Sequence, residues 1–338
     1  MLHQQNLPIE SNPIFVMTKS FQYIPSTTEF IQANTTVRVG EVRLGQHVKD
    51  CSNQDGCNYV ILGIEESVGP RLNLGLPGAE NGYSAFLPRF LNMQSNRFLD
   101  GSDILIAGTI QVNPASSNEN LTVEELDELV SETLQPFLSQ GMTPVVIGGG
   151  HNNALPIIRA IHKFSDSSLG IINMDPHGDC RATDFRHSGN SFSYGLEEKI
   201  MHYYAVIGLH PQYNNSFILD FLNRKDCGYS LFDDYLVGKR DLLTDVYSEK
   251  SHLESLGKYG IELDMDAITG MPSSAFTPSG FSLNEARMFV KTLANSSNCA
   301  YLHLPEGAPS SEHENKIVGK ALAYLVWDFI HEHQKSKL

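Results

Sequence analysis

Short apolar runs rich in β-branched and aromatic residues alternate along most of this chain with segments of helical periodicity. A parallel neighbour strand needs a crossover connection, so this alternation is typical of a parallel sheet covered by helices on both faces. We therefore predict an α/β fold, a three-layer αβα sandwich with a mostly parallel sheet of about eight strands. The predicted strands are Tyr59–Ile64, Asp103–Ala107, Pro144–Ile147, Leu169–Met174, Tyr204–Gly208, Tyr229–Phe232, Tyr259–Asp264 and Ala300–Leu304.

The chain has 338 residues, of which 41% are hydrophobic, and this suits one large α/β domain or two smaller ones. We predict a single domain over residues 51–338, with residues 1–50 as an N-terminal extension packed on it. The predicted helices lie near residues 79–94, 122–140, 153–164, 215–224, 240–256, 282–296 and 311–333. Three of them begin with a capping-box pair: Thr122 with Glu125, Ser282 with Glu285 and Ser311 with Glu314.

The charge and the cysteines exclude several classes of protein. A net charge of −15 disfavours nucleic acid and anionic membranes as partners. The N-terminus lacks a basic start followed by an apolar core, and the apolar stretch 321–330 is short and contains Asp328. The five cysteines are scattered without a CxxC pair, which is typical of a reduced protein. We expect a cytoplasmic protein without membrane or nucleic-acid partners.

Polar motifs directly follow four of the predicted strands. In open α/β sheets, ligands bind outside the carboxyl ends of the strands, so one sheet edge can gather all four motifs. The residues concerned are His151 after VVIGGG, Asp175, His177 and Asp179 after LGIINM, Asp264 and Asp266 after YGIEL, and Glu306 after YLHLP.

The motif residues have the chemistry of metal ligands. In extended backbone the side chains of Asp175, His177 and Asp179 point the same way, and such a cluster is costly without a cation. Taken singly, a histidine after a glycine turn or a DxD pair is usually structural, but their joint placement favours a metal site. Two divalent ions would balance four carboxylates, and the mixed ligands suit Mn²⁺. The predicted ligands are His151, Asp175, His177, Asp179, Asp264 and Asp266.

Together these residues resemble the ureohydrolase family of arginases, agmatinases and formimidoylglutamases. Family motifs GGDH, DAHxD, DxD and a late ExNP correspond here to GGGH (148–151), DPHGD (175–179), DMD (264–266) and EGAP (306–309). The resemblance implies an arginase-like αβα sandwich, two Mn²⁺ ions per chain, a homo-oligomer, and hydrolysis of a C–N bond in an amidine or guanidine. It further implies that Glu306 offsets the substrate's positive charge and that Asp179 passes a proton to the leaving nitrogen.

This chain departs from the family pattern without losing a predicted ligand. Gly150 stands in place of the aspartate of GGDH, and Pro176 in place of alanine. Thr269 and Gly270 replace an Asp-Pro pair, and Ala308 replaces the late asparagine. Glu262 shares strand parity with Asp264 and Asp266, and two roles stay open for it: it supports the ligands, or it only caps a neighbouring group. The departures indicate a divergent subgroup.

Arg181, two residues past the last DPHGD ligand, discriminates between substrates. Arginases have asparagine there and a histidine where Phe192 stands, whereas formimidoylglutamases have DLR and SGTPF, which this chain resembles more closely. A guanidinium can bind a substrate carboxylate with two hydrogen bonds. We therefore expect a small cationic amidine with a carboxylate, most simply formimidoylglutamate, contacted by Arg181, Ser188, Asn190 and Glu306. The competing interpretation of Arg181 is a salt bridge to the aspartate cluster.

Other functions stay open at this point. Within the family, the alternative is an arginase, agmatinase or guanidino-acid hydrolase that releases urea, or a catalytically silent metal-binding protein. A deacetylase-like hydrolase would share the architecture, but it would use one zinc ion and a tandem histidine pair, and no His-His occurs here. A nucleotide-binding protein is disfavoured because the glycine turn lacks the GxxxxGK[ST] motif.

Overall fold

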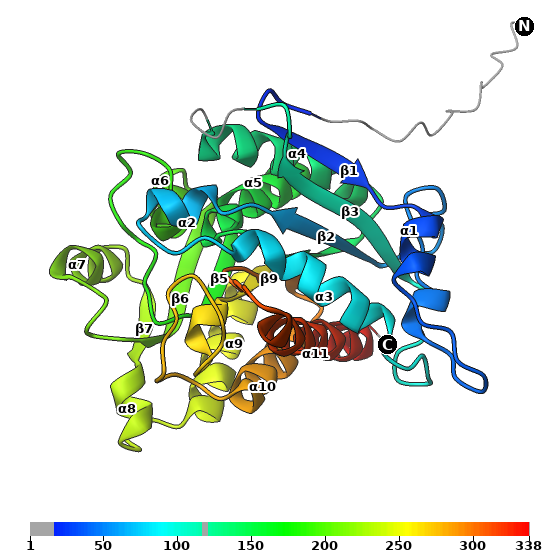
Figure 1. The fold of residues 1–338 in the computed structure, drawn as a ribbon. Coiled ribbons are helices and arrows are strands. Elements are labelled where there is room, and N and C mark those ends of the chain that lie inside the picture. Colours follow the sequence, from blue (N-terminus) through cyan, green and yellow to red (C-terminus); the bar gives the residue numbers. More distant parts are fainter. Residues whose placement is uncertain (1–16, 117–120, 338) are drawn as a thin grey trace, which may run out of the picture.

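The computed structural model describes residues 17–116 and 121–337, which form a nine-stranded sheet between two layers of helices (Figure 1). The sheet order is β1-β3-β2-β4-β9-β8-β5-β6-β7, and within these residues every paired neighbour is parallel except β1 with β3. The strands are β1 (Phe21–Pro25), β2 (Tyr59–Glu65), β3 (Ile104–Val112), β4 (Thr143–Ile147), β5 (Leu169–Met174), β6 (Met201–Leu209), β7 (Gly228–Leu231), β8 (Tyr259–Leu263) and β9 (Cys299–Leu304).

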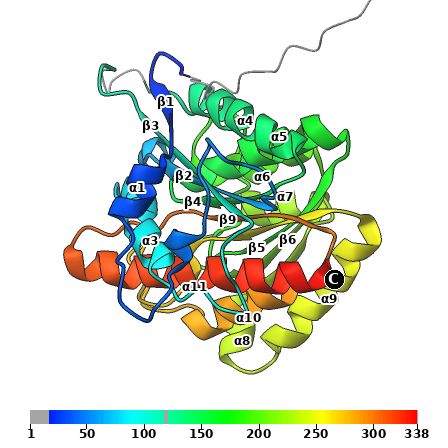
Figure 2. The same cartoon turned by 90° about the vertical axis from the view of Figure 1, so that its right-hand side faces the viewer.

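Helices cover both faces of the sheet, as Figure 2 shows with α4 and α5 on one side and α10 and α11 on the other. The three-layer αβα prediction is therefore confirmed. The helices are α1 (Thr28–Ala33), α2 (Val68–Leu72), α3 (Gly82–Leu91), α4 (Val123–Ser139), α5 (Ala154–Ser165), α6 (Ser191–Glu197), α7 (Ser216–Arg224), α8 (Phe232–Leu236), α9 (Leu242–Leu256), α10 (Leu283–Ala294) and α11 (Glu312–Ser336).

Two hydrophobic cores lie on the two faces of the sheet. Successive side chains of a strand point to opposite faces, so Val145 and Ile147 of β4 enter one core and Val146 enters the other. The first core also holds residues of α3, α9, α10 and α11, and the second holds residues of α4, α5, α6 and α7. Burial on both faces explains why the central strands read as continuous apolar runs.

The structure adds a ninth strand that the apolar runs did not predict. β1 pairs antiparallel with β3, with Phe21 opposite Val112. Only Phe21 and Tyr23 of this edge strand are well buried, whereas Ile24 is exposed, so its apolar signal is short. Residues 1–16 of the expected N-terminal extension lie outside the described residues. No helix in the described ranges is long and apolar enough to cross a membrane.

Candidate metal centre

Four neighbouring strands in the middle of the sheet carry the four polar motifs at their carboxyl ends. In the order β4-β9-β8-β5, they lead into His151, Glu306, Asp264 and Asp175. Main-chain hydrogen bonds continue the pairing beyond the strands, from Glu306 N to Gly149 O at 2.9 Å and from Asp264 N to Met174 O at 3.1 Å. The sheet therefore gathers side chains that are up to 155 residues apart in the sequence.

His151 lies at the centre of one half of the cluster. Its Nδ1 is 2.9 Å from Asp179 Oδ2, 3.1 Å from Asp264 Oδ2 and 3.2 Å from Asp175 Oδ2. One ligand atom from each of these four residues lies within 4.8 Å of the others. Three carboxylates and one imidazole nitrogen around a single small volume form a donor set for a divalent cation.

His177 and Asp266 extend the cluster toward a second position. His177 Nδ1 is 3.3 Å from Asp175 Oδ1 and 3.8 Å from Asp266 Oδ2. Asp175 thus faces both histidines, with Oδ2 toward His151 and Oδ1 toward His177. The structure brings all six predicted ligand side chains together, with Asp175 between the two halves.

The buried acidic groups of the cluster favour the binding of cations. Burial and the neighbouring carboxylates of Asp266 and Asp175 raise the pKa of Asp264 well above its usual range. Burial opposes a charged ring at His177, but hydrogen bonding to Asp175 and the field of the acidic groups raise its pKa to about 10. The neighbouring carboxylates contribute to both shifts, because negative groups packed close together favour any positive charge that can enter.

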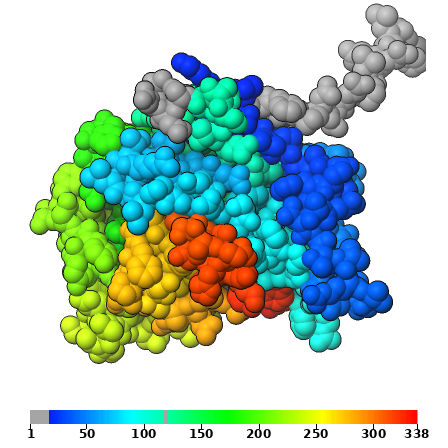
Figure 3. Space-filling model, in the orientation of Figure 1, coloured from blue at the N-terminus to red at the C-terminus, as the bar shows by residue number. Residues whose placement is uncertain are grey.

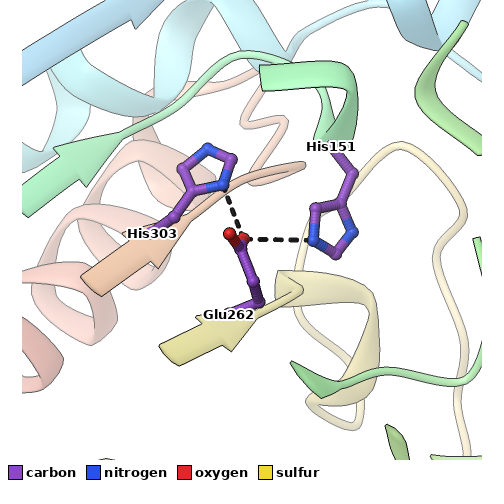
Figure 4. A group of neighbouring side chains, drawn as sticks. All are labelled: His151, Glu262 and His303. Atoms are coloured by element: carbon purple, nitrogen blue, oxygen red, sulfur yellow. Dashed lines mark hydrogen bonds and ion pairs between the residues drawn. The ribbon is translucent and has the colours of Figure 1, made fainter. Parts of the chain in front are cut away.

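Glu262 and His303 support the far side of the His151 ring (Figure 4). Glu262 Oε2 is 3.3 Å from His151 Nε2 and 2.7 Å from His303 Nδ1, and Tyr301 donates a hydrogen bond of 2.6 Å to Glu262 Oε1. A proton on His151 Nε2 that points to Glu262 leaves the Nδ1 lone pair free for a cation. Of the two roles considered for Glu262, this contact with His151 favours support of a ligand. The sequence analysis did not single out His303 and Tyr301, which precede the motif at the end of β9.

Glu66 holds the main chain that leads into His151, and the sequence analysis did not single it out. Its buried carboxylate accepts hydrogen bonds from Gly150 N at 2.8 Å and from the Asn153 side chain at 2.8 Å. It also accepts from the main-chain N–H of Val68 at 2.5 Å. Glu66 directly follows β2, the neighbour of β4, so the strand-end rule that found the other motifs could have found it.

Glu306 presents an unpaired carboxylate oxygen to the site. Its Oε1 accepts a hydrogen bond of 2.7 Å from His151 N, while Oε2 is buried and has no partner among the described residues. Burial, followed by the nearby charge of Asp266, raises the pKa of Glu306 to about 8. Its backbone also has a positive φ of 67°, an unusual conformation for a side-chain-bearing residue that is found at functional sites. The free oxygen is suited to a cationic N–H donor.

A cavity of about 190 Å³ opens onto the cluster, and we call it the metal cavity. Arg181 and Ser188 lie in its wall together with His177, Asp266 and Glu306. Within the described residues, the Arg181 guanidinium forms no ion pair with a carboxylate, so the salt bridge considered for it is not observed. Its side chain lies against the main chain of Gly189, where a Cβ would come within 3.0 Å of Arg181 Cδ.

Asn190 does not line this cavity, contrary to the expectation that it contacts substrate. Its side-chain amide donates to Phe185 O at 2.7 Å and to Ala182 O at 3.1 Å. Its oxygen accepts from Arg186 at 2.9 Å. Asn190 is fully buried and ties the 182–190 loop together, so its contribution is to hold the loop that carries Ser188.

Segments distant in the sequence meet at the surface around the mouth of the metal cavity. In Figure 3 the light-blue segment that includes α2 borders the yellow segment near residue 270 and the orange-red segment that precedes α11. Leu76 N donates to Ser274 O at 3.2 Å, and the Asn81 side chain donates to Pro309 O at 3.0 Å. These contacts join the loops from opposite ends of the chain into one rim.

An α/β sandwich with acidic and imidazole side chains at the ends of its central strands is the arrangement expected of an arginase-like fold. The model of the arginase family matches residues 60–331, and the chain therefore belongs to the arginase family.

The chain is similar in sequence to known relatives over most of their length. The chain is 23% identical to a formimidoylglutamase of Streptococcus pyogenes over 326 residues, which covers 90% of this chain and 96% of that protein. It is 27% identical to a formimidoylglutamase of Photorhabdus laumondii, with coverage of 81% and 86%.

Solved structures show the same fold. A Trypanosoma cruzi formiminoglutamase solved with Mn²⁺ has a TM-score of 0.72 and 22% identity, and 86% of this chain and 97% of that chain are covered. A proclavaminate amidino hydrolase from Streptomyces clavuligerus has a TM-score of 0.70 and 17% identity, with coverage of 90% and 99%. The fold alone therefore does not distinguish an amidine substrate from a guanidine.

Proposed function

We propose that this chain is a dinuclear metal hydrolase that cleaves a C–N bond in a linear amidine, with formimidoylglutamate giving glutamate and formamide. The observation that carries the proposal is the convergence of the six predicted ligands beside a cavity that also presents Arg181. The formimidoylglutamases among its relatives support this choice of substrate. The resemblance to the family and the scattered cysteines further support a cytoplasmic homo-oligomer.

The residues fit two divalent cations, for which Mn²⁺ is our choice. His151, Asp175, Asp179 and Asp264 would hold one ion, while His177 and Asp266 would hold the other together with Asp175 and Asp264. The fit is supported by the orphaned Glu306 oxygen and by the pKa of Asp264, which burial and then the neighbouring carboxylates raise well above its usual range. When bound, a pair of such ions activates water at neutral pH and stabilises developing negative charge.

We infer the orientation of the substrate from two side chains, Glu306 and Arg181. Glu306 Oε2 accepts a hydrogen bond from the amidinium and offsets its positive charge, while Arg181 binds the carboxylate. Holding both ends places the amidine carbon beside the ligand cluster, and this positioning reduces the entropic cost of the reaction. Asp179, on a strained backbone with φ of 45°, receives a proton and delivers it to the leaving nitrogen.

Phe192 favours the amidine over arginine. It stands where arginases have a histidine, and its ring stacks on Tyr204 at 4.3 Å and meets the His151 ring edge-on at 5.2 Å. Phe192 is fully buried and packs against the His151 ring. Because its phenyl ring has no titratable group, it cannot carry a proton as a histidine could. A urea-releasing guanidine hydrolase is the second candidate, because the fold is shared with an amidino hydrolase and does not by itself separate the two substrates.

The test is to load the purified protein with Mn²⁺ and to assay formimidoylglutamate, arginine and agmatine. We expect turnover of formimidoylglutamate, and release of urea from arginine or agmatine alone would contradict the proposal. Asp264→Asn should lose bound metal and turnover together, while Asp220→Asn, on the exposed face of α7, should keep both. Metal content that is unchanged in Asp264→Asn would refute the ligand assignment.

A further inference from the structure

A second cavity, of about 460 Å³, adjoins the metal cavity, and we call it the side cavity. We propose that the side cavity is a substrate subsite for an apolar side chain, so that the chain also hydrolyses N-formimidoyl amino acids with one carboxylate and an apolar side chain. This inference rests on the proposed function and adds a substrate class to it.

The two cavities share part of their walls. Asn73, Leu74, Arg181 and Ile218 line both of them. An amino acid whose carboxylate is bound by Arg181 and whose amidine reaches Glu306 has its Cα between the two cavities. Its side chain can then enter the side cavity.

The wall of the side cavity is largely apolar and open to water. Leu72, Leu74, Phe185 and Phe217 are 42%, 95%, 50% and 47% exposed. A group of large apolar side chains around a cavity mouth is typical of a binding surface, because leaving it in water is unfavourable. Leu74 also has a positive φ of 65°, the kind of backbone strain that clusters at ligand-binding sites.

The charges around the cavities disfavour a second carboxylate. Among the lining residues of both cavities, Arg181 is the one arginine, and no lysine occurs. The side cavity also contains Asp184, and burial together with Arg181 lowers the pKa of its His187 to about 4, so that this ring is neutral. With Arg181 bound to the α-carboxylate, the side-chain carboxylate of glutamate would find no second cation there, whereas an apolar side chain bears no such penalty.

The experiment compares N-formimidoyl-L-leucine with N-formimidoyl-L-glutamate, which share the amidine and the α-carboxylate. Wild-type protein loaded with Mn²⁺ should show a kcat/KM for the leucine compound at least equal to that for the glutamate compound. In Phe185→Ser/Phe217→Ser, the leucine-to-glutamate ratio of kcat/KM should fall about tenfold, mainly through KM. Phe164→Ser is the matched control, because Phe164 is 49% exposed and lines neither cavity, and it should leave the ratio unchanged.

Two results separate failure of the subsite from failure of the proposed function. Turnover of the glutamate compound with more than hundredfold slower turnover of the leucine compound would overturn the subsite alone. If neither compound is turned over, the proposed function fails, and calorimetric titration with N-acetyl-L-leucine decides the subsite. Equal affinity in wild type and in Phe185→Ser/Phe217→Ser would reject it, and tenfold weaker binding in the variant would support it.

The competing occupant of this surface is a second copy of the chain. Sedimentation analysis of wild type and Phe185→Ser/Phe217→Ser distinguishes the two. An unchanged oligomeric state supports the substrate subsite, while dissociation of the variant would assign these side chains to a subunit contact and overturn the proposal.

Discussion

The main chain at Gly150 lies against the ring of Pro70, where an added Cβ would come within 2.3 Å of Pro70 Cδ. The aspartate that the family motif has at this position does not fit here. Glu66 provides a carboxylate from the neighbouring strand end and binds the same stretch of main chain. At the residue scale, the main chain at Gly150 is therefore held by a side chain 84 residues earlier.

Glu66→Gln should weaken Mn²⁺ binding by about 10- to 100-fold, since residues that hold metal ligands in place have effects of this size. The new amide group would place a donor against the N–H groups that now point at Glu66, and the His151 loop would shift. Titration followed by electron paramagnetic resonance measures the affinity. Glu65→Gln removes the same charge one residue earlier without a contact to that loop. Equal affinities in the two variants would contradict the role of Glu66.

His333 makes stability depend on pH. Its buried ring lies beside Tyr59 and Phe329, and burial followed by the charge of Lys337 lowers its pKa to about 4. Because the folded-state pKa lies below the usual 6.5, the unfolded chain binds the proton first as the pH falls. Stability is therefore lost as the pH falls from about 6.5 toward 4, by about 2 kcal/mol between pH 7 and pH 5.

Urea unfolding at pH 7 and pH 5 tests this prediction. His333→Phe should lose about 2 kcal/mol less than wild type between the two values, since its ring cannot be protonated. The exposed His313→Gln should behave as wild type. A loss in His333→Phe that matches wild type would show that other groups cause the acid sensitivity.

At the scale of elements, the sequence located the residues that cap the helices correctly. The hydrogen-bond partners of the capping glutamates, however, differ from one helix to another. Ser282 and Glu285 form the full reciprocal box at the start of α10. At α4, Thr122 accepts the expected hydrogen bond from Glu125 N, but the Glu125 carboxylate accepts from Ser20 N at 2.8 Å instead. One capping residue thereby joins α4 to the segment that leads into β1.

Helices α3 and α11 meet at Gly319, where a Cβ would come within 2.1 Å of Ala85 O. Gly319→Ala should lower the free energy of unfolding by about 1–3 kcal/mol, because the helices must separate. In an unconstrained helix the same change would stabilise by about 1 kcal/mol, so the sign of the effect is diagnostic. Urea unfolding measures it, with the exposed Lys320→Ala as control. A gain in stability would show that the two helices do not constrain this position.

At the scale of the whole molecule, the centre of the sheet concentrates negative charge. Buried Asp175, Asp264, Asp266 and Glu306 lie within one site in a chain that already carries a net charge of −15. Their mutual repulsion opposes folding, and binding of cations relieves it. Stability and metal occupancy are therefore linked.

Mn²⁺ at one hundred times its dissociation constant should stabilise the protein by about 2.7 kcal/mol, which raises Tm by several degrees. Calorimetry with Mn²⁺ and with EDTA measures the difference. Asp264→Asn should show a much smaller metal-dependent shift. Identical Tm values for the wild type under both conditions would argue against a metal site coupled to folding.

The sequence alone determined the layers, the parallel strands and the ligand motifs, because these depend on local periodicity and on the residues that directly follow each strand. His151, Asp175 and Asp264 could be found in this way without knowing which strands are neighbours. The tertiary structure alone decided that β4, β9, β8 and β5 lie side by side. It also decided that Glu66 holds the main chain before His151, that Asn190 faces its own loop, and that Arg181 lines two cavities. The physical reason is that these properties depend on packing between residues far apart in the chain, which local patterns do not encode.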